Sequence, residues 1–253
     1  MTLATLEAVL LVGGLGTRLS SELGDLPKPM VEVGGYPFLE HELLHLRAFG
    51  IHSIVLAVSH RREAIEQRFT DGRGLDLSIA YSRETQPLGT AGALRNALPL
   101  LHGDEVLVLN GDSFAEIDYD ELLRFHRSHG GQLTISALHQ PDCRDYGRLK
   151  ILDGQVLGFV EKSPADPSPG YINAGVYVFS RGLIESIRPG VVESLENKLF
   201  PSLIARGERI YAYCTKGYFI DMGTPQRLQQ LRSDFLRGAV PLRGVIPAKG
   251  LSS

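Results

Sequence analysis

Cysteine, long apolar runs and excess positive charge are all scarce in this sequence. Its two cysteines, Cys143 and Cys214, are too few for a disulfide framework and fit no metal-ligand spacing, which favours buried thiols in a reducing compartment. The opening "MTLATLEAVLLVGG" has an apolar run of only about seven residues and no basic start, so it predicts neither a signal peptide nor a membrane span. A formal net charge of −3 argues against a nucleic-acid partner. We therefore expect a cytoplasmic protein that binds neither membranes nor nucleic acids.

Internal repeats are also absent, and without a hexapeptide array we expect no β-helix domain. The first half instead alternates runs rich in Val, Ile and Leu with helical patterns. The runs predict strands at 7–12, 53–58, 77–81 and 105–109, and helical periodicity falls at 37–49, 60–69 and 90–98. This alternation predicts an α/β fold with a Rossmann-like, mostly parallel sheet flanked by helices. Ligands of such sheets bind outside the carboxyl ends of the strands.

The pattern changes near residue 132. Runs separated by short turns, "QLTISALHQ", "GRLKIL", "QVLGFVEK" and "YINAGVYVFS", predict mixed or antiparallel strands. Helical periodicity returns at 194–206 and 224–237, and the residues beyond have no period. We expect one domain over 1–237, made of a part at about 1–131, a smaller β-rich part at about 132–220 and a closing helix at 224–237. A loosely ordered tail at 238–253 follows.

A glycine-rich segment, "LLVGGLGTRLSSELGDLPKPM", follows the first predicted strand. At Gly13, Gly14 and Gly16 the missing side chains let backbone N–H groups approach a phosphate closely. Arg18 and Lys28 add positive charge that phosphates attract. The segment breaks the dinucleotide fingerprint at its third glycine and lacks the Gly-Lys-Ser/Thr of a Walker loop. It predicts a phosphate site of another kind, with a tight strand-to-helix turn as the alternative.

Two aspartates lie at strand ends. Asp112 follows the run "EVLVLNG", and Asp221 in "GYFIDMGTP" precedes a helix for which Thr224 is the expected N-cap. One or two carboxylates with substrate phosphates and waters are a common Mg²⁺ site, so the pair is a candidate metal site. The alternatives are a turn residue at Asp112 and an acid favoured by the helix dipole at Asp221.

The stretch "HELLH" matches the HExxH zinc pattern on a predicted helix. At 100° per residue, however, Leu39, Leu43 and Leu46 form one apolar stripe, and His41 and His45 fall on the opposite side. No third ligand motif follows. We therefore expect surface histidines, with a zinc peptidase as the less favoured alternative.

Taken in order, "GGLGTRL", "PKPM", "PLGTAGAL", "NGD", "EK", "NAG" and "FIDMGTP" give the chain a family resemblance over about residues 8–235. The chain resembles the sugar-1-phosphate nucleotidylyltransferases, also called nucleoside-diphosphate-sugar pyrophosphorylases. Its short length and the segments "PKPMVEVGG" and "PLGTAGALRNA" look most like the D-glycero-α-D-manno-heptose 1-phosphate guanylyltransferases. Mannose-1-phosphate guanylyltransferases and glucose-1-phosphate cytidylyl- or thymidylyltransferases are the alternatives.

The resemblance implies a nucleotide-diphospho-sugar transferase fold, with a nucleotide-binding part at 1–131 and a sugar-binding part at 132–220. It implies an Mg²⁺-dependent reaction in which a nucleoside triphosphate, GTP by preference, and a sugar 1-phosphate give an NDP-sugar for polysaccharide or glycan synthesis and release pyrophosphate. The resemblance leaves the oligomeric state undecided, with a homodimer as one option. A non-catalytic nucleotide-sugar sensor on the same fold is the alternative from another class.

The resemblance also implies roles for the residues that match the family motifs. It implies that the nucleotide is bound by Val12, Gly13, Gly14, Gly16, Thr17, Arg18, Glu84, Gly89, Thr90, Asn110 and Gly111. It implies a sugar site formed by Gly147, Glu161, Lys162, Asn173 and Gly175, and a metal site formed by Asp112 and Asp221. It implies catalytic roles for Arg18, Lys28, Asp112 and Lys162.

The expected chemistry agrees with these residue types. A sugar-phosphate oxygen attacks the α-phosphorus in line with departing pyrophosphate, so positioning and charge neutralisation matter more than a side-chain nucleophile or base. Guanine presents N–H donors on its pairing edge, and Glu84 and Gln86 are candidate acceptors near it. By pattern alone, Glu84 could equally be a solvated loop acid.

Overall fold

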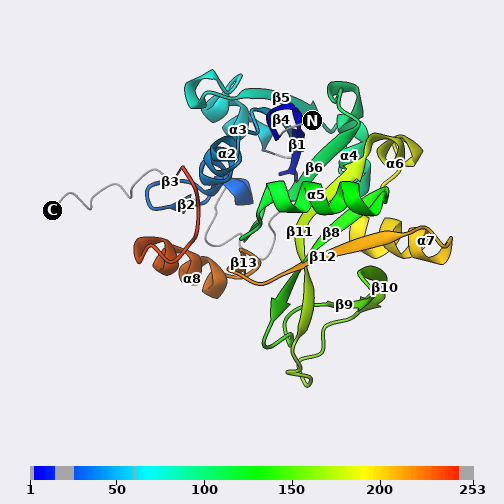
Figure 1. Cartoon of the computed structure of the whole chain (residues 1–253). Coiled ribbons are helices and arrows are strands. Elements are labelled where there is room, and N and C mark those ends of the chain that lie inside the picture. The colour runs from blue at the N-terminus through cyan, green and yellow to red at the C-terminus, as the bar shows by residue number, and fades with distance from the viewer. Residues whose placement is uncertain (1–2, 15–25, 60, 245–253) are drawn as a thin grey trace.

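The computed structural model describes residues 3–14, 26–59 and 61–244, and a nine-stranded sheet forms its centre (Figure 1). The strands lie in the order β5-β4-β1-β6-β11-β8-β12-β10-β9. Their bounds are β1 Glu7–Leu11, β4 Ser53–Val58, β5 Ser78–Arg83, β6 Glu105–Asn110, β8 Leu133–Gln140, β9 Arg148–Leu152, β10 Gln155–Val160, β11 Gly170–Ser180 and β12 Ile210–Thr215. The sheet is parallel from β5 to β6 and mixed beyond, which confirms the predicted fold class.

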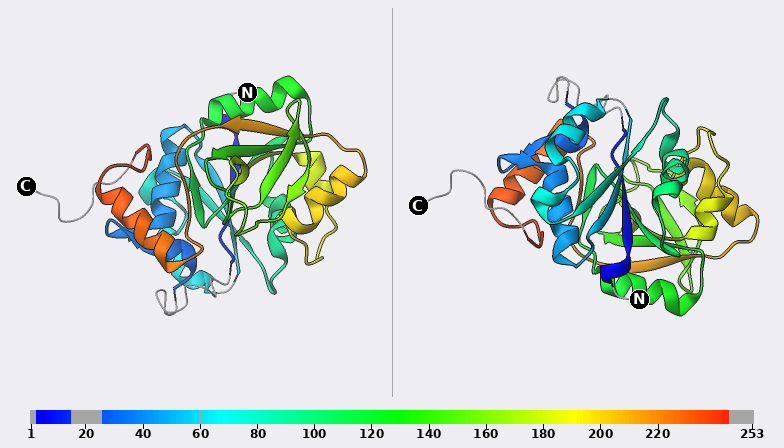
Figure 2. Two further views of the ribbon diagram at one scale, coloured as in Figure 1. Left: turned by 90° about the horizontal axis from the view of Figure 1, so that it is seen from below. Right: turned by 90° about the horizontal axis from the view of Figure 1, so that it is seen from above.

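Helices cover both faces of the sheet (Figure 2). Their bounds are α2 Phe38–Ala48, α3 Arg62–Phe69, α4 Gly89–Ala97, α5 Tyr119–His129, α6 Arg181–Ser186, α7 Phe200–Ala205 and α8 Pro225–Leu236. Alternate strand residues face opposite ways, so Ala8 and Leu10 pack with α2, α3 and α5, whereas Val9 and Val55 pack with α4, α6 and α7. Burial on both faces explains why these strands read as continuous apolar runs in the sequence.

Two short strand pairs lie outside the main sheet. They are β2 Glu32–Val33 with β3 Tyr36–Pro37, and β7 Ser113–Ala115 with β13 Phe219–Asp221. The antiparallel β7–β13 pair places Asp221 opposite Ser113, and the Met222 amide donates to the Asp112 carbonyl oxygen at 2.9 Å. Two sequence segments more than a hundred residues apart are thereby joined beside the end of β6.

The expectation of surface histidines on α2 is wrong. His41 and His45 are 1% and 2% exposed, because α8 and the residues after it form a second layer over the face of α2 that points away from the sheet (Figure 2). The His41 ring lies 4.7 Å from that of Phe235, and the His45 ring 5.3 Å from that of Phe114. The His41 Nε2 atom is bonded to the Val33 carbonyl oxygen at 2.9 Å.

Burial has opposite effects on the titratable groups of this helix. It lowers the pKa of His45 to about 4 and raises the pKa of Glu42 to about 8, since in each case the charged form is disfavoured. Within the described ranges, no group of three or more His, Cys, Asp or Glu side chains could hold a metal ion. These observations leave no support for a zinc peptidase site at "HELLH".

The first residues after α8 are packed, which corrects the expectation of a loose tail for 238–244. Val240 is buried, the Arg243 amide donates to His45 Nδ1 at 2.8 Å, and the Arg243 guanidinium carbon lies 4.0 Å from the centre of the Phe49 ring. Residues 245–253 lie outside the described part of the chain. Of the two cysteines, Cys143 is buried as expected, but Cys214 is exposed. None of the described helices is long and apolar enough to cross a membrane.

Candidate active site

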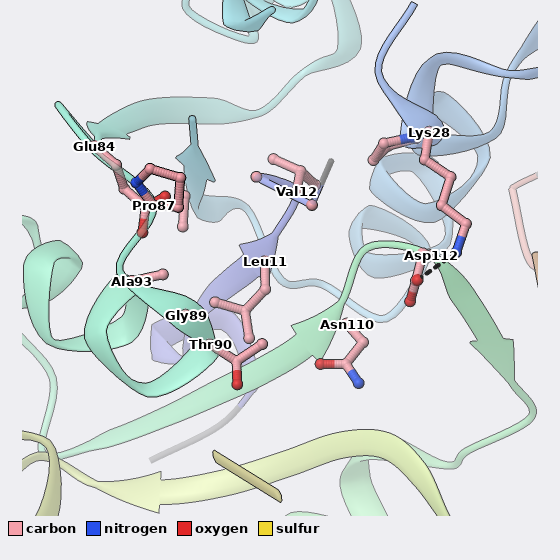
Figure 3. Close-up of a pocket in the computed structure, with 14 residues that line it drawn as sticks. Leu11, Val12, Lys28, Glu84, Pro87, Gly89, Thr90, Ala93, Asn110 and Asp112 are labelled. Carbon is pink, nitrogen blue, oxygen red and sulfur yellow. Dashed lines mark hydrogen bonds and ion pairs between the residues drawn. The ribbon is translucent and has the colours of Figure 1, made fainter. Parts of the chain in front are cut away.

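A cavity of about 380 Å³ opens at the carboxyl ends of β1, β4 and β6 (Figure 3). It is lined by Leu11, Val12, Gly13, Gly14, Lys28, Pro29, Ala57, Glu84, Pro87, Gly89, Thr90, Ala93, Asn110 and Asp112. Most of the predicted nucleotide-binding residues are therefore brought together at one place. Gly16, Thr17 and Arg18 lie outside the described residues.

The glycines after β1 keep one wall of the cavity free of side chains. A Cβ atom on Gly13 would lie 2.9 Å from the Ser59 Cβ atom, so no larger residue fits there, whereas no atom of the described residues lies within 4 Å of a Cβ atom on Gly14. Gly111 has a different role, because a Cβ atom on it would lie 2.5 Å from Val12 Cγ1. Its amide donates to the Leu11 carbonyl oxygen at 3.0 Å. The ends of β1 and β6 can therefore approach closely and leave an open backbone edge.

The start of α4 forms another wall of the cavity and packs against residues 193–196 of the same chain. Gly89 has φ +71°, and a Cβ atom there would lie 2.5 Å from the Glu193 carbonyl oxygen. Thr90 Oγ1 accepts from the Leu195 amide at 2.8 Å and donates to Glu196 Oε2 at 3.3 Å. Leu195 begins the helical turn η6 (Leu195–Leu199). Gly89 is thus required both for its backbone conformation and for its close contact.

Glu84 lies in the wall of the cavity and is buried, so the alternative of a solvated loop acid is wrong. The residue is 8% exposed, and burial raises the pKa of its carboxyl group. Its Oε1 atom has no hydrogen-bond partner within the described structure. Figure 3 shows Glu84 at one end of the cavity and Lys28 with Asp112 at the other. An unpaired buried acceptor is costly unless a ligand satisfies it.

At the other end, Lys28 forms an ion pair with Asp112. Lys28 begins the helical turn η3 (Lys28–Met30), where Pro27 and Pro29 restrict the backbone, and its side chain is 13% exposed. Its Nζ atom lies 2.6 Å from Asp112 Oδ2 (Figure 3). Asp112 is 47% exposed, so it can be reached from the solvent side. The ammonium is therefore fixed beside a carboxylate that faces the opening.

Asp221 also has a cationic partner. It accepts a hydrogen bond from the Gly223 amide at 2.8 Å and is paired with the guanidinium of Arg227 in the first turn of α8. The hydrogen bond from the Met222 amide to the Asp112 carbonyl oxygen brings the end of β13, which carries Asp221, beside the turn between β6 and β7, which carries Asp112. That the two carboxylates share one metal ion stays a prediction.

The predicted sugar-site residues fall into two groups. Gly175 adjoins the cavity-lining Asn110, because a Cβ atom on Gly175, at φ +73°, would lie 3.0 Å from Asn110 Nδ2. The Gly175 amide donates to Asn173 Oδ1 at 3.0 Å. Glu161 and Lys162 are exposed beyond β10 and are not part of the cavity lining. Gly147 precedes both groups in sequence, and a Cβ atom there would lie 3.3 Å from the Val160 carbonyl oxygen.

A hydrogen-bond chain through the buried Tyr177 lies behind the cavity and was not predicted from the sequence. Asn173 Nδ2 donates to the Tyr177 hydroxyl at 2.9 Å, and that hydroxyl donates to Glu196 Oε1 at 3.0 Å. Glu196 in turn accepts from Thr90. A polar tyrosine within the apolar strand "VYVF" is a signal that could have suggested such a network, but nothing in the sequence identifies its partner.

The fold and the cavity define a protein with an open α/β sheet and a pocket at the carboxyl ends of its strands, which is where such sheets bind their ligands. The model of the nucleotidyl transferase family matches residues 7–237, and the chain belongs to that family. It is 40% identical over 248 residues to a mannose-1-phosphate guanylyltransferase of Mycobacterium tuberculosis, a match that covers 97% of this chain and 67% of the relative. It is 32% identical over 229 residues to a D-glycero-alpha-D-manno-heptose 1-phosphate guanylyltransferase of Aneurinibacillus thermoaerophilus, covering 90% of this chain and 98% of the relative.

A solved structure gives the same result. HddC from Yersinia pseudotuberculosis, complexed with GMP-PN, superposes with a TM-score of 0.82 at 33% identity and covers 91% of this chain and 99% of its own. The chain spans 61% to 67% of the length of four relatives that are named as mannose-1-phosphate guanylyltransferases or their catalytic subunits. Identity is thus higher to the mannose-1-phosphate guanylyltransferase, whereas the match covers more of the heptose 1-phosphate guanylyltransferase.

Proposed function

We propose that this protein transfers a guanylyl group from GTP to a sugar 1-phosphate of D-manno configuration, either the heptose or mannose, and releases pyrophosphate. The observation that carries the proposal is one cavity with a buried carboxylate, Glu84, at one end and the Lys28–Asp112 pair at the other. One oxygen of that carboxylate, Oε1, has no hydrogen-bond partner among the described residues. The names of the relatives support the substrate class, because the heptose and mannose rings share their configuration.

Glu84 would recognise the base. Guanine offers N–H donors along its pairing edge, and a buried carboxylate with a free oxygen is a suitable acceptor for them. These hydrogen bonds would stabilise the ionised form, which burial alone disfavours. Adenine and cytosine each present an acceptor on that edge, so the same carboxylate would reject them.

The open edge at Gly13 and Gly14, together with Lys28, would hold the triphosphate. We propose that Arg18, which lies outside the described residues, adds a second cation at the β and γ phosphates. Two anions must approach each other in this reaction, and fixed cations lower the electrostatic cost of that approach. The sugar-phosphate oxygen is itself the nucleophile, so no side chain has to form a covalent intermediate.

We propose Asp112 and Asp221 as the carboxylates that hold Mg²⁺. Asp221 ends β13 and Asp112 lies in the turn before β7, and the backbone hydrogen bond from Met222 to Asp112 joins these segments. Each carboxylate is paired with a cation of the protein, so both positions favour positive charge. When bound, Mg²⁺ would supply Lewis-acid charge at the phosphates. Asp112 and Lys28 would then fix the reacting phosphate from the protein side.

We propose that residues 132–220 form the sugar-binding part, with Gly147, Glu161, Lys162, Asn173 and Gly175 around the sugar 1-phosphate. Gly175 is supported by its close approach to Asn110 in the cavity wall, and Asn173 by the hydrogen bond that its Oδ1 atom accepts from the Gly175 amide. Glu161 and Lys162 would have to approach from the exposed end of β10. Residues 1–131 would form the nucleotide-binding part and 224–237 the closing helix.

Pyrophosphate release measured over a matrix of substrates tests the proposal. Five nucleoside triphosphates are each paired with mannose 1-phosphate, D-glycero-α-D-manno-heptose 1-phosphate and glucose 1-phosphate, with Mg²⁺ present and absent. We expect Mg²⁺-dependent release with GTP and a manno-configured sugar phosphate, and the better of the two sugars identifies the substrate. Release only with CTP or dTTP and glucose 1-phosphate would contradict the proposal. Binding of GTP without release in any pair would favour a sensor.

A further inference from the structure

The side chain of Arg227 joins the candidate metal residue Asp221 to the loop that precedes β9. Its guanidinium is paired with the Asp221 carboxylate, and its NH2 nitrogen lies 3.3 Å from Asp145 Oδ2. Its Cζ atom lies 4.6 Å from the centre of the Tyr146 ring, which in turn contacts Phe219 edge-on at 5.6 Å. Carboxylate partners and an aromatic face suit a guanidinium better than an ammonium.

This arrangement parallels the one at Asp112. Lys28 is paired with the Asp112 carboxylate, and Arg227 is paired with the carboxylate of Asp221. Asp221 ends β13, which pairs with β7, the strand that begins directly after Asp112. The Arg227 side chain is 23% exposed, so the pair lies near the surface and can open without unfolding the core. A divalent ion that binds Asp221 must compete with the guanidinium for the same oxygens.

On the basis that Asp221 is an ion ligand as proposed above, we propose that Arg227 is a positioning residue that occupies the place of the ion at Asp221. It weakens ion binding to the free protein and links ion binding to the loop 142–147. When the ion takes Asp221, the guanidinium keeps its contacts with Asp145 and Tyr146. Its charge is then free for an incoming phosphate beside Gly147. By reciprocity, an anion that draws Arg227 away from Asp221 strengthens ion binding.

Mn²⁺ binding to the free protein, measured by the loss of the free-ion electron paramagnetic resonance signal, tests this role without relying on turnover. We expect Arg227→Gln to bind Mn²⁺ about tenfold more tightly than the unaltered protein, a change of about 1.4 kcal/mol. That size is typical of removing one repelling charge near a surface site. Arg227→Lys keeps the charge and should stay within about threefold of the unaltered protein.

Arg237→Gln is the matched control, because Arg237 lies at the end of the same helix and is paired with Asp234. We expect it to leave Mn²⁺ affinity unchanged. Thermal unfolding of each variant checks the fold. A purely structural clamp would predict a lower melting temperature for Arg227→Gln with unchanged or weaker Mn²⁺ binding, and that result overturns the proposal.

Two further arms separate failure of this proposal from failure of the metal assignment. If Arg227→Gln binds Mn²⁺ tightly and Asp221→Asn in that background does not, both assignments stand. If the double variant still binds tightly, Asp221 is not the ligand and the proposed metal site is wrong. If Arg227→Gln binds no more tightly, yet Asp221→Asn abolishes Mn²⁺ binding in the presence of GTP, only the role of Arg227 is wrong.

Discussion

Replacing Glu84 by glutamine isolates the recognition of the base. The side chain keeps its size, but an amide has one acceptor oxygen and turns N–H donors toward guanine donors. A hydrogen bond to a charged group contributes about 1.5–3 kcal/mol in a buried site. At about 1.4 kcal/mol per factor of ten, kcat/KM for GTP should fall by about 10- to 150-fold. The loss for ATP, which does not use this acceptor, should be much smaller.

The assay is pyrophosphate release with GTP and with ATP at several pH values. Burial raises the pKa of Glu84, so the folded carboxyl group binds a proton at a higher pH than an exposed glutamate does. Protonation removes an acceptor, so kcat/KM for GTP should fall as the pH drops through that raised pKa. Glu84→Gln should lack this acidic limb. Glu63→Gln, on the exposed surface of α3, is the control and should behave as the unaltered protein.

If Glu84→Gln keeps the full preference for GTP over ATP and the same acidic limb, Glu84 does not read the base. In that case its unpaired oxygen has another explanation, and the guanine preference would have to come from backbone carbonyl groups near Gly89.

Three other substitutions test the remaining assignments. Asp112→Asn should lower kcat by at least about 100-fold at saturating Mg²⁺; thermal unfolding should stay within a few degrees, since Asp112 is half-exposed and ion pairs near the surface contribute about 1 kcal/mol. Lys28→Ala should reduce kcat by about 10²–10³-fold with a smaller change in GTP affinity, measured separately by calorimetry, because its charge acts as the phosphates converge. In the unaltered protein the free energy of unfolding should fall by up to about 1.4 kcal/mol per pH unit from pH 6.5 to the folded pKa of Glu42, about 8. Glu42→Gln should not show this fall. The sign follows because folded Glu42 retains a proton that the unfolded chain releases, and urea unfolding at pH 6.5 and 8 measures it.

The parallel half of the sheet was predictable from the sequence because burial on both faces leaves a direct signal. The observed β4 spans the predicted 53–58, and β1 and β6 differ from their predicted ranges by one residue. The helix α5 was missed although its signals are present: Asp118 caps it by accepting from the Glu121 amide, and Gly130 ends it in a left-handed conformation. Its buried residues Tyr119, Leu122, Leu123 and His126 also follow helical spacing, so this helix could have been predicted from the sequence.

Exposure on α2 could not be predicted in the same way. Helical periodicity identifies the face that packs on the sheet, but it cannot show that a second layer covers the other face. Here Phe235 and Arg243, nearly two hundred residues away in sequence, cover His41 and His45. A histidine tolerates such burial as a neutral ring, so its presence on the polar side of a helical wheel does not establish exposure.

The neighbouring placement of the segments that carry Asp112 and Asp221 was predictable only as chemistry. The sequence indicates that both follow strands, but the geometry depends on β7 and β13, each three residues long, which are too short to be recognised from sequence. The role of Arg227 was not predicted from the sequence either. A single arginine in the first turn of a helix is ordinary, and only the fold shows that it reaches Asp221 and Asp145 at once.

The buried chain through Tyr177 explains how the two halves of the site can hold fixed positions relative to each other. Thr90 lies in the nucleotide wall and Asn173 on the proposed sugar side, and both are bonded to the Tyr177–Glu196 pair. Burial of the Tyr177 hydroxyl raises its pKa well above the usual value, so it stays a neutral donor at every physiological pH. In a reaction where catalysis depends on bringing two phosphates into line, a rigid hydrogen-bonded connection between their binding walls limits misalignment. The strand β11 therefore does more than complete the sheet, because it carries the residues that join the two walls.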